Sequence, residues 1–200
     1  MVSEKARKTA KIISFIFDGS FLSIPLFVII ALEVSSNAFL AIGYAAICTL
    51  FIMVIPYLYI LFLLKRKRIN DVHLPVKGNR MRPLIVMDTS FTLCYFILYL
   101  LDAPDFLRTM ILASLFTVVM LTVITIFWKI SFHASWITFV SITLCILYGK
   151  WALLTFILLP LVAWARVIIK RHTIMQVIAG ACVTVVTSLF TYNLFGYFHI

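Results

Sequence analysis

Two histidines and a group of cations lie in three short polar breaks between long apolar segments. The breaks read KGNRMRP (residues 77–83), KISFH (129–133) and RVIIKRH (166–172). An imidazole can attack phosphorus, and a second imidazole can protonate the leaving oxygen. Guanidinium groups match phosphate oxygens with paired hydrogen bonds, and lysine adds a point charge. His133, His172 and Arg166 therefore favour phosphoryl transfer, provided that the fold brings the three breaks together.

The composition predicts the kind of protein that must position these side chains. Of the 200 residues, 64% are hydrophobic and only 12% are charged, and the mean hydropathy is +1.14. A soluble domain carries about 25% charged residues. Because lipid cannot hydrogen-bond the backbone, such a chain is expected to be an integral membrane protein built of helices. Carboxylate clusters and Cys/His sets with metal spacing are absent from the sequence, so we expect neither a metal nor another cofactor.

Apolar runs between polar breaks predict an all-α, polytopic transmembrane helix bundle of about six to seven spans. The fifth and sixth runs are short and could instead form one re-entrant pair. We expect a single membrane domain, with two N-terminal spans in residues 1–64, a basic loop at 65–83 and the remaining spans in 84–200. The candidate spans are 12–33, 38–64, 84–101, 107–128, 134–148, 151–165 and 173–197.

The basic residues predict the sidedness of this bundle. If the spans alternate, every Lys and Arg except Arg108 and Lys150 lies on the face that also holds the N-terminus. The positive-inside rule makes that face cytoplasmic and places the C-terminus outside. The net charge of +10 is spread over short segments beside the spans. It therefore favours anionic lipid head groups over nucleic acid as partners. Asp18, an acid within the first apolar run, is expected to pair with a cation or to line a cavity.

The order and spacing of the three breaks resemble the type 2 phosphatidic acid phosphatase superfamily, the membrane lipid phosphatases related to vanadium haloperoxidases. The third motif of that family is Ser-Arg, five residues, His, three residues, Asp, and Arg166, His172 and Gln176 reproduce its spacing. In the second motif, Pro-Ser-Gly-His, Ser131 and His133 hold the Ser and His places. The first motif is Lys, six residues, Arg-Pro. Arg82-Pro83 fits its end, and Lys77 or Arg80 substitutes for its lysine.

The resemblance implies a phosphatase-like helical core and a role for each matching residue. His172 would be the nucleophile that becomes phosphorylated, and His133 would be the general acid. Arg166 and Arg82, with Lys77 or Arg80 and with Ser131, would hold the phosphate. The implied activity is metal-independent hydrolysis of a monophosphate or diphosphate on a membrane lipid, of the isoprenyl or the phosphatidate type. Lys170 and Arg171 are expected to act only as topology signals.

This chain departs from the family pattern beside the nucleophile. Gln176 stands where the family has an aspartate, and a glutamine carbonyl can accept an imidazole N–H without stabilising an imidazolium by charge. Asp88, in the third expected span, is a candidate for the missing carboxylate. The alternative functions are a catalytically degenerate member that binds anionic lipid or a phosphorylated ligand, and a small transporter. A transporter is expected to show inverted repeats or interrupted helices in both halves, and we find neither in the sequence.

Overall fold

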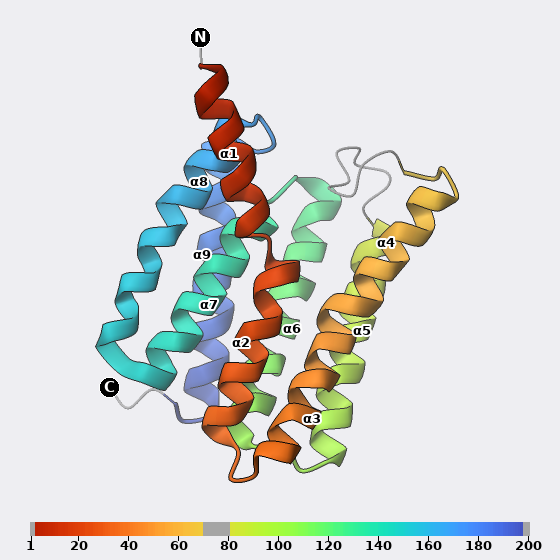
Figure 1. The fold of residues 1–200 in the computed structure, drawn as a ribbon, viewed down its shortest axis with the longest axis vertical. Coiled ribbons are helices and arrows are strands. Elements are labelled where there is room, and N and C mark those ends of the chain that lie inside the picture. Colours follow the sequence, from red (N-terminus) through yellow and green to blue (C-terminus); the bar gives the residue numbers. More distant parts are fainter. Residues whose placement is uncertain (1–2, 70–80, 198–200) are drawn as a thin grey trace. The chain divides into compact units, whose positions relative to one another are not determined.

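The computed structural model describes residues 3–69 and 81–197, and every regular element in these two ranges is helical (Figure 1). The all-α prediction is therefore confirmed for the part of the chain that the structure describes. The chain divides into two compact units, which are described separately below. One unit contains Met1–Gly19 and Val123–Ile200, and the other contains Ser20–Thr122.

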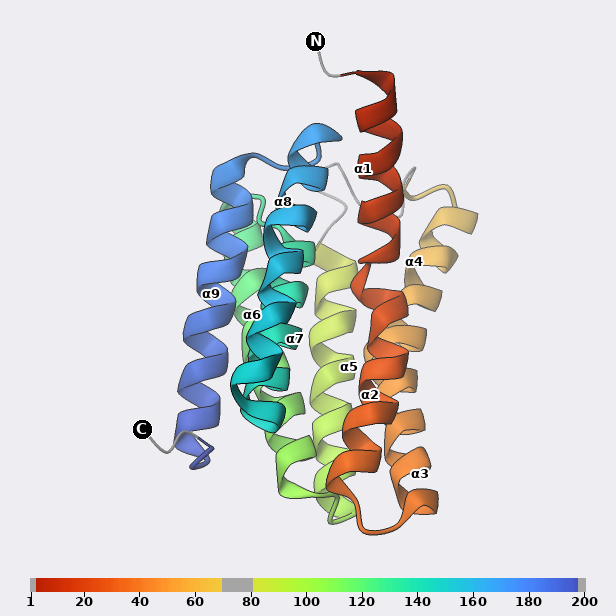
Figure 2. The same ribbon diagram turned by 60° about the vertical axis from the view of Figure 1, so that its left-hand side comes forward.

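The first unit is built around two long helices, α7 and α9, which pack along one another (Figures 1 and 2). The short helix α8 packs on α7, and α1 packs on α8. In this unit the start of α1 and the α8–α9 loop lie at one end, and the α7–η3 turn lies at the other (Figure 1). The elements are α1 (Glu4–Ile16), α7 (Phe132–Tyr148), η3 (Gly149–Ile157), α8 (Leu158–Ile168) and α9 (Ile174–Leu194).

A sharp turn at Gly149 produces the hairpin between α7 and α8. Gly149 has φ 72° and ψ −156°, a conformation that L side chains rarely adopt and that glycine permits. The chain then continues as the 3-10 helix η3, which packs back on α7 before α8 begins. Pro160 lies in the first turn of α8, where its missing N–H costs nothing. The expected runs 134–148 and 151–165 thus form two antiparallel arms (Figure 1).

Hydrogen bonds between side-chain hydroxyl groups join α7 to α9. The hydroxyls of Ser135 and Thr184 lie 2.6 Å apart, and those of Thr143 and Tyr192 lie 2.9 Å apart. All four side chains are buried. In lipid there is little hydrophobic force between helices, so close packing of small residues and such hydrogen bonds hold them together.

The second unit contains a long apolar helical stretch, α3–η1–α4, that packs on α5. Its π-helical segment η1 ends two residues before Pro56, which cannot donate to the carbonyl four residues earlier. Tyr44 donates to the carbonyl of Leu101 at 3.4 Å, and Ser90 donates to the carbonyl of Phe51. The elements are α2 (Gly19–Val34), α3 (Ala38–Cys48), η1 (Thr49–Val54), α4 (Ile55–Lys65), α5 (Met81–Leu100) and α6 (Asp105–Phe127), whose last turn belongs to the first unit.

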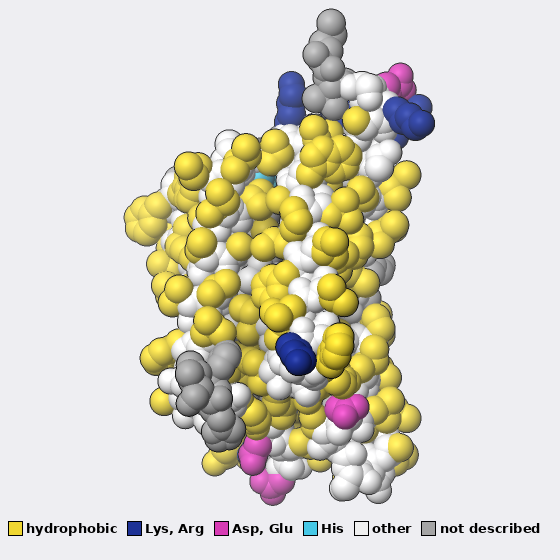
Figure 3. All heavy atoms as spheres, turned by 90° about the vertical axis from the view of Figure 1, so that its left-hand side faces the viewer, with side chains coloured by type: hydrophobic (Ala, Val, Ile, Leu, Met, Phe, Trp, Pro, Cys, Tyr) yellow, Lys and Arg dark blue, Asp and Glu magenta, His cyan; other side chains and the backbone are white. Residues whose placement is uncertain are grey.

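Five helical stretches in the described residues are long and apolar enough to cross a membrane, which identifies a helical membrane protein. The expected count of six to seven spans is not confirmed. The run expected at 12–33 is interrupted at Phe17 and Asp18, between α1 and α2, and leaves the shorter apolar helix Leu22–Val34. Hydrophobic side chains predominate on the surface in Figure 3. The five stretches are Ala38–Lys65, Met81–Leu100, Asp105–Phe127, Phe132–Ile168 and Ile174–Leu194.

Candidate functional site

The first unit brings together the side chains of the second and third polar breaks. His133 is the second residue of α7, and Ser131 is the N-cap of that helix. Arg166 lies in the last turn of α8, and His172 lies in the loop before α9. His133, Arg166 and His172 all belong to the first unit, and the first two act electrostatically on the imidazole of the third.

The end of α8 explains the spacing between Arg166 and His172. The backbone carbonyl of Arg166 accepts from the N–H of Arg171 (3.1 Å) and from the N–H of His172 (3.3 Å). The N–H of Lys170 donates to the carbonyl of Val167 (2.9 Å), and Lys170 has φ 57°. This is a Schellman C-cap, with Lys170 in the left-handed position that glycine usually takes. The turn of the helix end therefore holds His172 directly after Arg166.

A glycine allows the break at 129–131 to lie against the first turns of α9. The N–H of Ser131 donates to the carbonyl of Gln176 (3.2 Å), and Lys129 Nζ donates to the carbonyl of Arg171. A Cβ atom on Gly180 would lie 2.5 Å from the carbonyl oxygen of Ser131. Because both the oxygen and the helix are backbone, only glycine permits this approach. Gly180 thus positions the start of α7, and with it His133.

Helix α1 supplies two further groups to the site. Ser14 Oγ accepts from Arg166 Nη1 at 2.8 Å, and Asp18 Oδ2 lies 3.2 Å from His133 Nε2. Arg166 is only 3% exposed, and a guanidinium at that depth is stable only when it is hydrogen-bonded or paired. Asp18 thus does pair with a cationic side chain when His133 is protonated. The sequence left open whether Asp18 pairs or lines a cavity.

The surroundings of His172 keep its imidazole neutral. Burial first, and then the positive charges of Arg166 and Lys129 and the proximity of His133, together lower the pKa of His172 to about 3, while a hydrogen bond to the Gln176 side chain opposes the shift. The Nδ1 atom of His172 is buried without a hydrogen-bond partner among residues 3–69 and 81–197. A neutral imidazole that donates from one nitrogen keeps a lone pair on the other. His172 therefore carries an unprotonated nitrogen beside two cations.

Gln176 and Ser131 both have structural roles in helix capping. The Gln176 side chain accepts from the N–H of Thr173 (3.2 Å), and Thr173 Oγ1 accepts from the N–H of Gln176 (3.3 Å), which completes a capping box at the start of α9. Ser131 is fully buried, and its hydroxyl accepts from the N–H of Ala134 (3.4 Å). The carboxylate of the site is supplied by Asp18, and it lies beside His133 rather than beside His172.

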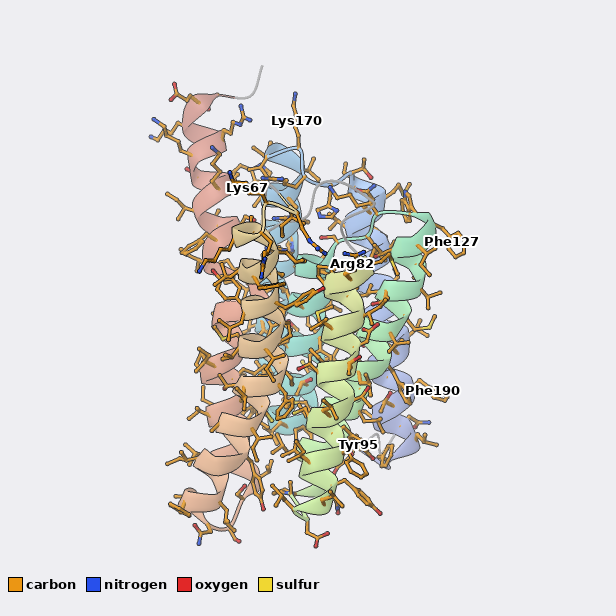
Figure 4. All side chains as sticks on the ribbon, turned by 90° about the vertical axis from the view of Figure 1, so that its right-hand side faces the viewer. Lys67, Arg82, Tyr95, Phe127, Lys170 and Phe190 are labelled. Atoms are coloured by element: carbon orange, nitrogen blue, oxygen red, sulfur yellow. The ribbon has the colours of Figure 1, made fainter. Side chains whose placement is uncertain are left out.

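The residues expected from the first break do not belong to this unit. Lys77 and Arg80 lie outside the described residues. Arg82 is exposed at the start of α5 in the second unit (Figure 4). Asp88, on the same helix, accepts from Thr122 Oγ1 at 3.2 Å. Lys170 is exposed and points away from the α8–α9 loop (Figure 4).

Three contributors to the site were missed in the sequence: Ser14, Lys129 as a charge acting on His172, and Gly180. A glycine inside an apolar helix costs about 1 kcal/mol relative to alanine, which is a readable signal of close backbone approach. The Thr173-x-x-Gln176 pattern is likewise a capping-box signature. The contacts of Ser14 with Arg166 and of Asp18 with His133 leave no such local signal in the sequence.

Within the two described ranges, no group of three or more His, Cys, Asp or Glu side chains is placed to hold a metal ion. Comparison of the chain with protein-family models, with curated proteins and with solved structures finds no match.

Proposed function

We propose that this chain hydrolyses a phosphate monoester or diphosphate carried by a membrane lipid, through a phosphohistidine intermediate and without a metal ion. One observation carries the proposal: the charges of Arg166 and Lys129 and the ring of His133 all act on a single half-buried imidazole, that of His172. A neutral nucleophile among fixed positive charges matches what phosphoryl transfer requires, because its catalysis consists mainly of positioning and charge neutralisation.

His172 is the nucleophile of the proposed reaction. With a pKa of about 3 it is unprotonated at neutral pH, so its lone pair is available for attack. A bond forms between the imidazole nitrogen and phosphorus as the bond between phosphorus and the lipid oxygen breaks. Arg166 and Lys129 stabilise the negative charge on the phosphate oxygens in the transition state.

His133 is the general acid. It gives its proton to the departing lipid oxygen, and Asp18, 3.2 Å from Nε2, orients the ring. In the second step water attacks phosphorus and passes a proton to His133. The nitrogen–phosphorus bond breaks, and inorganic phosphate leaves with both histidines in their starting states.

The proposed substrate enters from the membrane surface with its hydrocarbon part in the bilayer. Isoprenyl phosphates or diphosphates and phosphatidate-type lipids are both included. We propose that the end of the first unit that carries the site faces the cytoplasm, because the positively charged segments gather there. The remaining surface cations would contact anionic lipid head groups.

A second candidate function is binding of a phosphorylated lipid without hydrolysis. It is favoured by Gln176, which is held in a capping box and places an amide instead of a carboxylate beside His172. Without that carboxylate an imidazolium at His172 would lack charge stabilisation. The two candidates differ in turnover, so one assay separates them.

The test measures phosphate release from a panel of isoprenyl and phosphatidate-type phosphates in detergent, with a metal chelator present. His172→Ala is expected to abolish release and the covalent retention of radiolabelled phosphate. His133→Ala is expected to slow release by about 10²–10⁴-fold, the usual contribution of a general acid. The matched controls are His73→Ala and His199→Ala, which remove the other two histidines of the chain.

Release that is unchanged in both the His172 and His133 variants would end the histidine mechanism. Tight binding of a lipid phosphate by wild type, with no release from any substrate, would favour the binding function instead. Release that requires added metal would also contradict the proposal.

A further inference from the structure

Helix α1 packs on α8 along a row of small residues. Ala6, Ala10 and Ser14 are spaced by four, so they lie on one face of the helix. Ala10 is fully buried and Ser14 is 5% exposed, and α1 contacts α8. Small side chains let two helices approach closely in lipid. The row places no large side chain between the two helices.

The rest of α1 has a cationic half followed by an apolar half. Its four cations Lys5, Arg7, Lys8 and Lys11 are all exposed, and only Lys8 pairs with an acid of the same helix, Glu4, at 3.1 Å. The cations are followed by three apolar side chains that are at least half exposed: Ile12 (59%), Phe15 (67%) and Ile16 (51%).

This order sets the depth of α1 in a bilayer. The exposed apolar residues belong in the hydrocarbon, and Lys8 precedes Ile12 by four residues, or about 6 Å along the helix. The polar layer on each side of a bilayer is about 5–7 Å thick. Lys8 therefore lies at the level of the lipid head groups, and Lys5 and Arg7 lie farther from the hydrocarbon along the helix.

The same helix ends in the candidate site. Ser14 accepts from Arg166, and Asp18, which follows α1, lies beside His133. A displacement of α1 along α8 would remove both contacts at once and leave Arg166 buried without Ser14. An interaction that fixes the cationic end of α1 at the membrane surface would therefore also keep the Ser14–Arg166 and Asp18–His133 contacts in place.

We propose that α1 binds anionic lipid head groups through Lys5, Arg7, Lys8 and Lys11, and that this binding keeps Ser14 and Asp18 in place on Arg166 and His133. The partner is an anionic lipid surface. Its effect on turnover rests on the proposed phosphatase function, whereas its effect on the docking of α1 does not.

The experiment places the full chain in vesicles of phosphatidylcholine alone or with about 30 mol% phosphatidylserine, enough to give an anionic surface potential. Amide hydrogen exchange over residues 7–16 reports whether α1 is docked. Exchange is expected to be slower by about fivefold or more in the anionic vesicles, the effect of even one surface cation. Phosphate release, measured in parallel, is expected to rise in the same vesicles.

Two variants make the comparison specific. Replacing Lys5, Arg7, Lys8 and Lys11 by Gln should abolish the lipid dependence and leave exchange in neutral vesicles unchanged. Replacing Lys65, Arg66, Lys67 and Arg68 by Gln removes the same number of charges from the other unit and should keep the full lipid dependence.

Equal exchange of α1 in both vesicles would overturn the proposal even if the chain is an active phosphatase. An equal loss of lipid dependence in both variants would overturn it as well. Lipid-dependent docking in a chain that releases no phosphate would support it and would count only against the proposed phosphatase function.

Discussion

The low pKa of His172 predicts that the protein loses stability when the pH falls below neutrality. Burial and the nearby charges of Arg166 and Lys129 lower the pKa of His172 to about 3 in the folded chain, from 6.5 in the unfolded chain. Between these two values the unfolded state binds a proton that the folded state does not. The free energy of unfolding therefore rises with pH in this window and falls on acidification.

The size of the effect follows from the width of the window. Each pH unit below 6.5 lowers the free energy of unfolding by about 1.36 kcal/mol, until His172 begins to take up a proton in the folded chain. Acidification from about pH 7 to about pH 5 thus costs about 2 kcal/mol for a fully shielded group. His172 is partly exposed, and solvent screening reduces the expected loss to about 1–2 kcal/mol.

The perturbation is His172→Gln, which removes the titrating group and keeps a polar side chain. The free energy of unfolding is measured by denaturant titration in mixed micelles at about pH 7 and about pH 5, where the linkage is expected to differ most. Wild type should lose about 1–2 kcal/mol more than the variant on acidification, and the control His73→Gln should behave like wild type. If wild type and His172→Gln lose the same free energy of unfolding on acidification, or if wild type loses less, the inference that His172 is neutral in the folded chain is refuted.

Three further substitutions test how the site is positioned. Gly180→Ala should cost about 1–3 kcal/mol because its Cβ would lie 2.5 Å from the carbonyl of Ser131. Unfolding measurements check the cost, and faster exchange of the Ser131 amide checks the displacement. Lys170→Gly should stabilise the chain by about 0.5–1 kcal/mol, because it relieves a left-handed residue, and a lower stability would contradict the Schellman C-cap. Tyr192→Phe should cost about 0.6–1.7 kcal/mol by removing the hydrogen bond with Thr143, and a double-mutant cycle with Thr143→Val should recover that coupling.

The parts of the fold that depend on local chemistry were predictable from the sequence. Lipid leaves the backbone only helices or closed barrels, so the helical class follows from composition. The proximity of Arg166 and His172 along the chain could equally be predicted from the sequence, because the end of α8 and its C-cap determine it. The starts of α5 and α7 differ from the expected spans by two or three residues, since Pro83 and Ser131 extend the helices at their N-termini.

The features that were not predictable depend on contacts between distant residues. Ser14 and Arg166 are separated by 152 positions, and nothing in either segment marks the other as its partner. The interruption at Phe17 and Asp18 is also invisible to hydropathy, because one acid in a long apolar run does not end it. The sequence offers Asp88, close to the first break, as a candidate carboxylate, whereas the acid 3.2 Å from a site histidine is Asp18.

The two histidines of the site have opposite electrostatic surroundings, and that difference is the strongest reason to give them different roles. His172 faces the charges of Arg166 and Lys129, which disfavour a proton on its ring, whereas His133 has the carboxylate of Asp18 at 3.2 Å from its Nε2. In the proposed reaction the nucleophile belongs to the loop after α8 and the general acid to the start of α7. Because the carboxylate of Asp18 follows α1, the proposed acid would depend on how α1 is seated at the membrane surface.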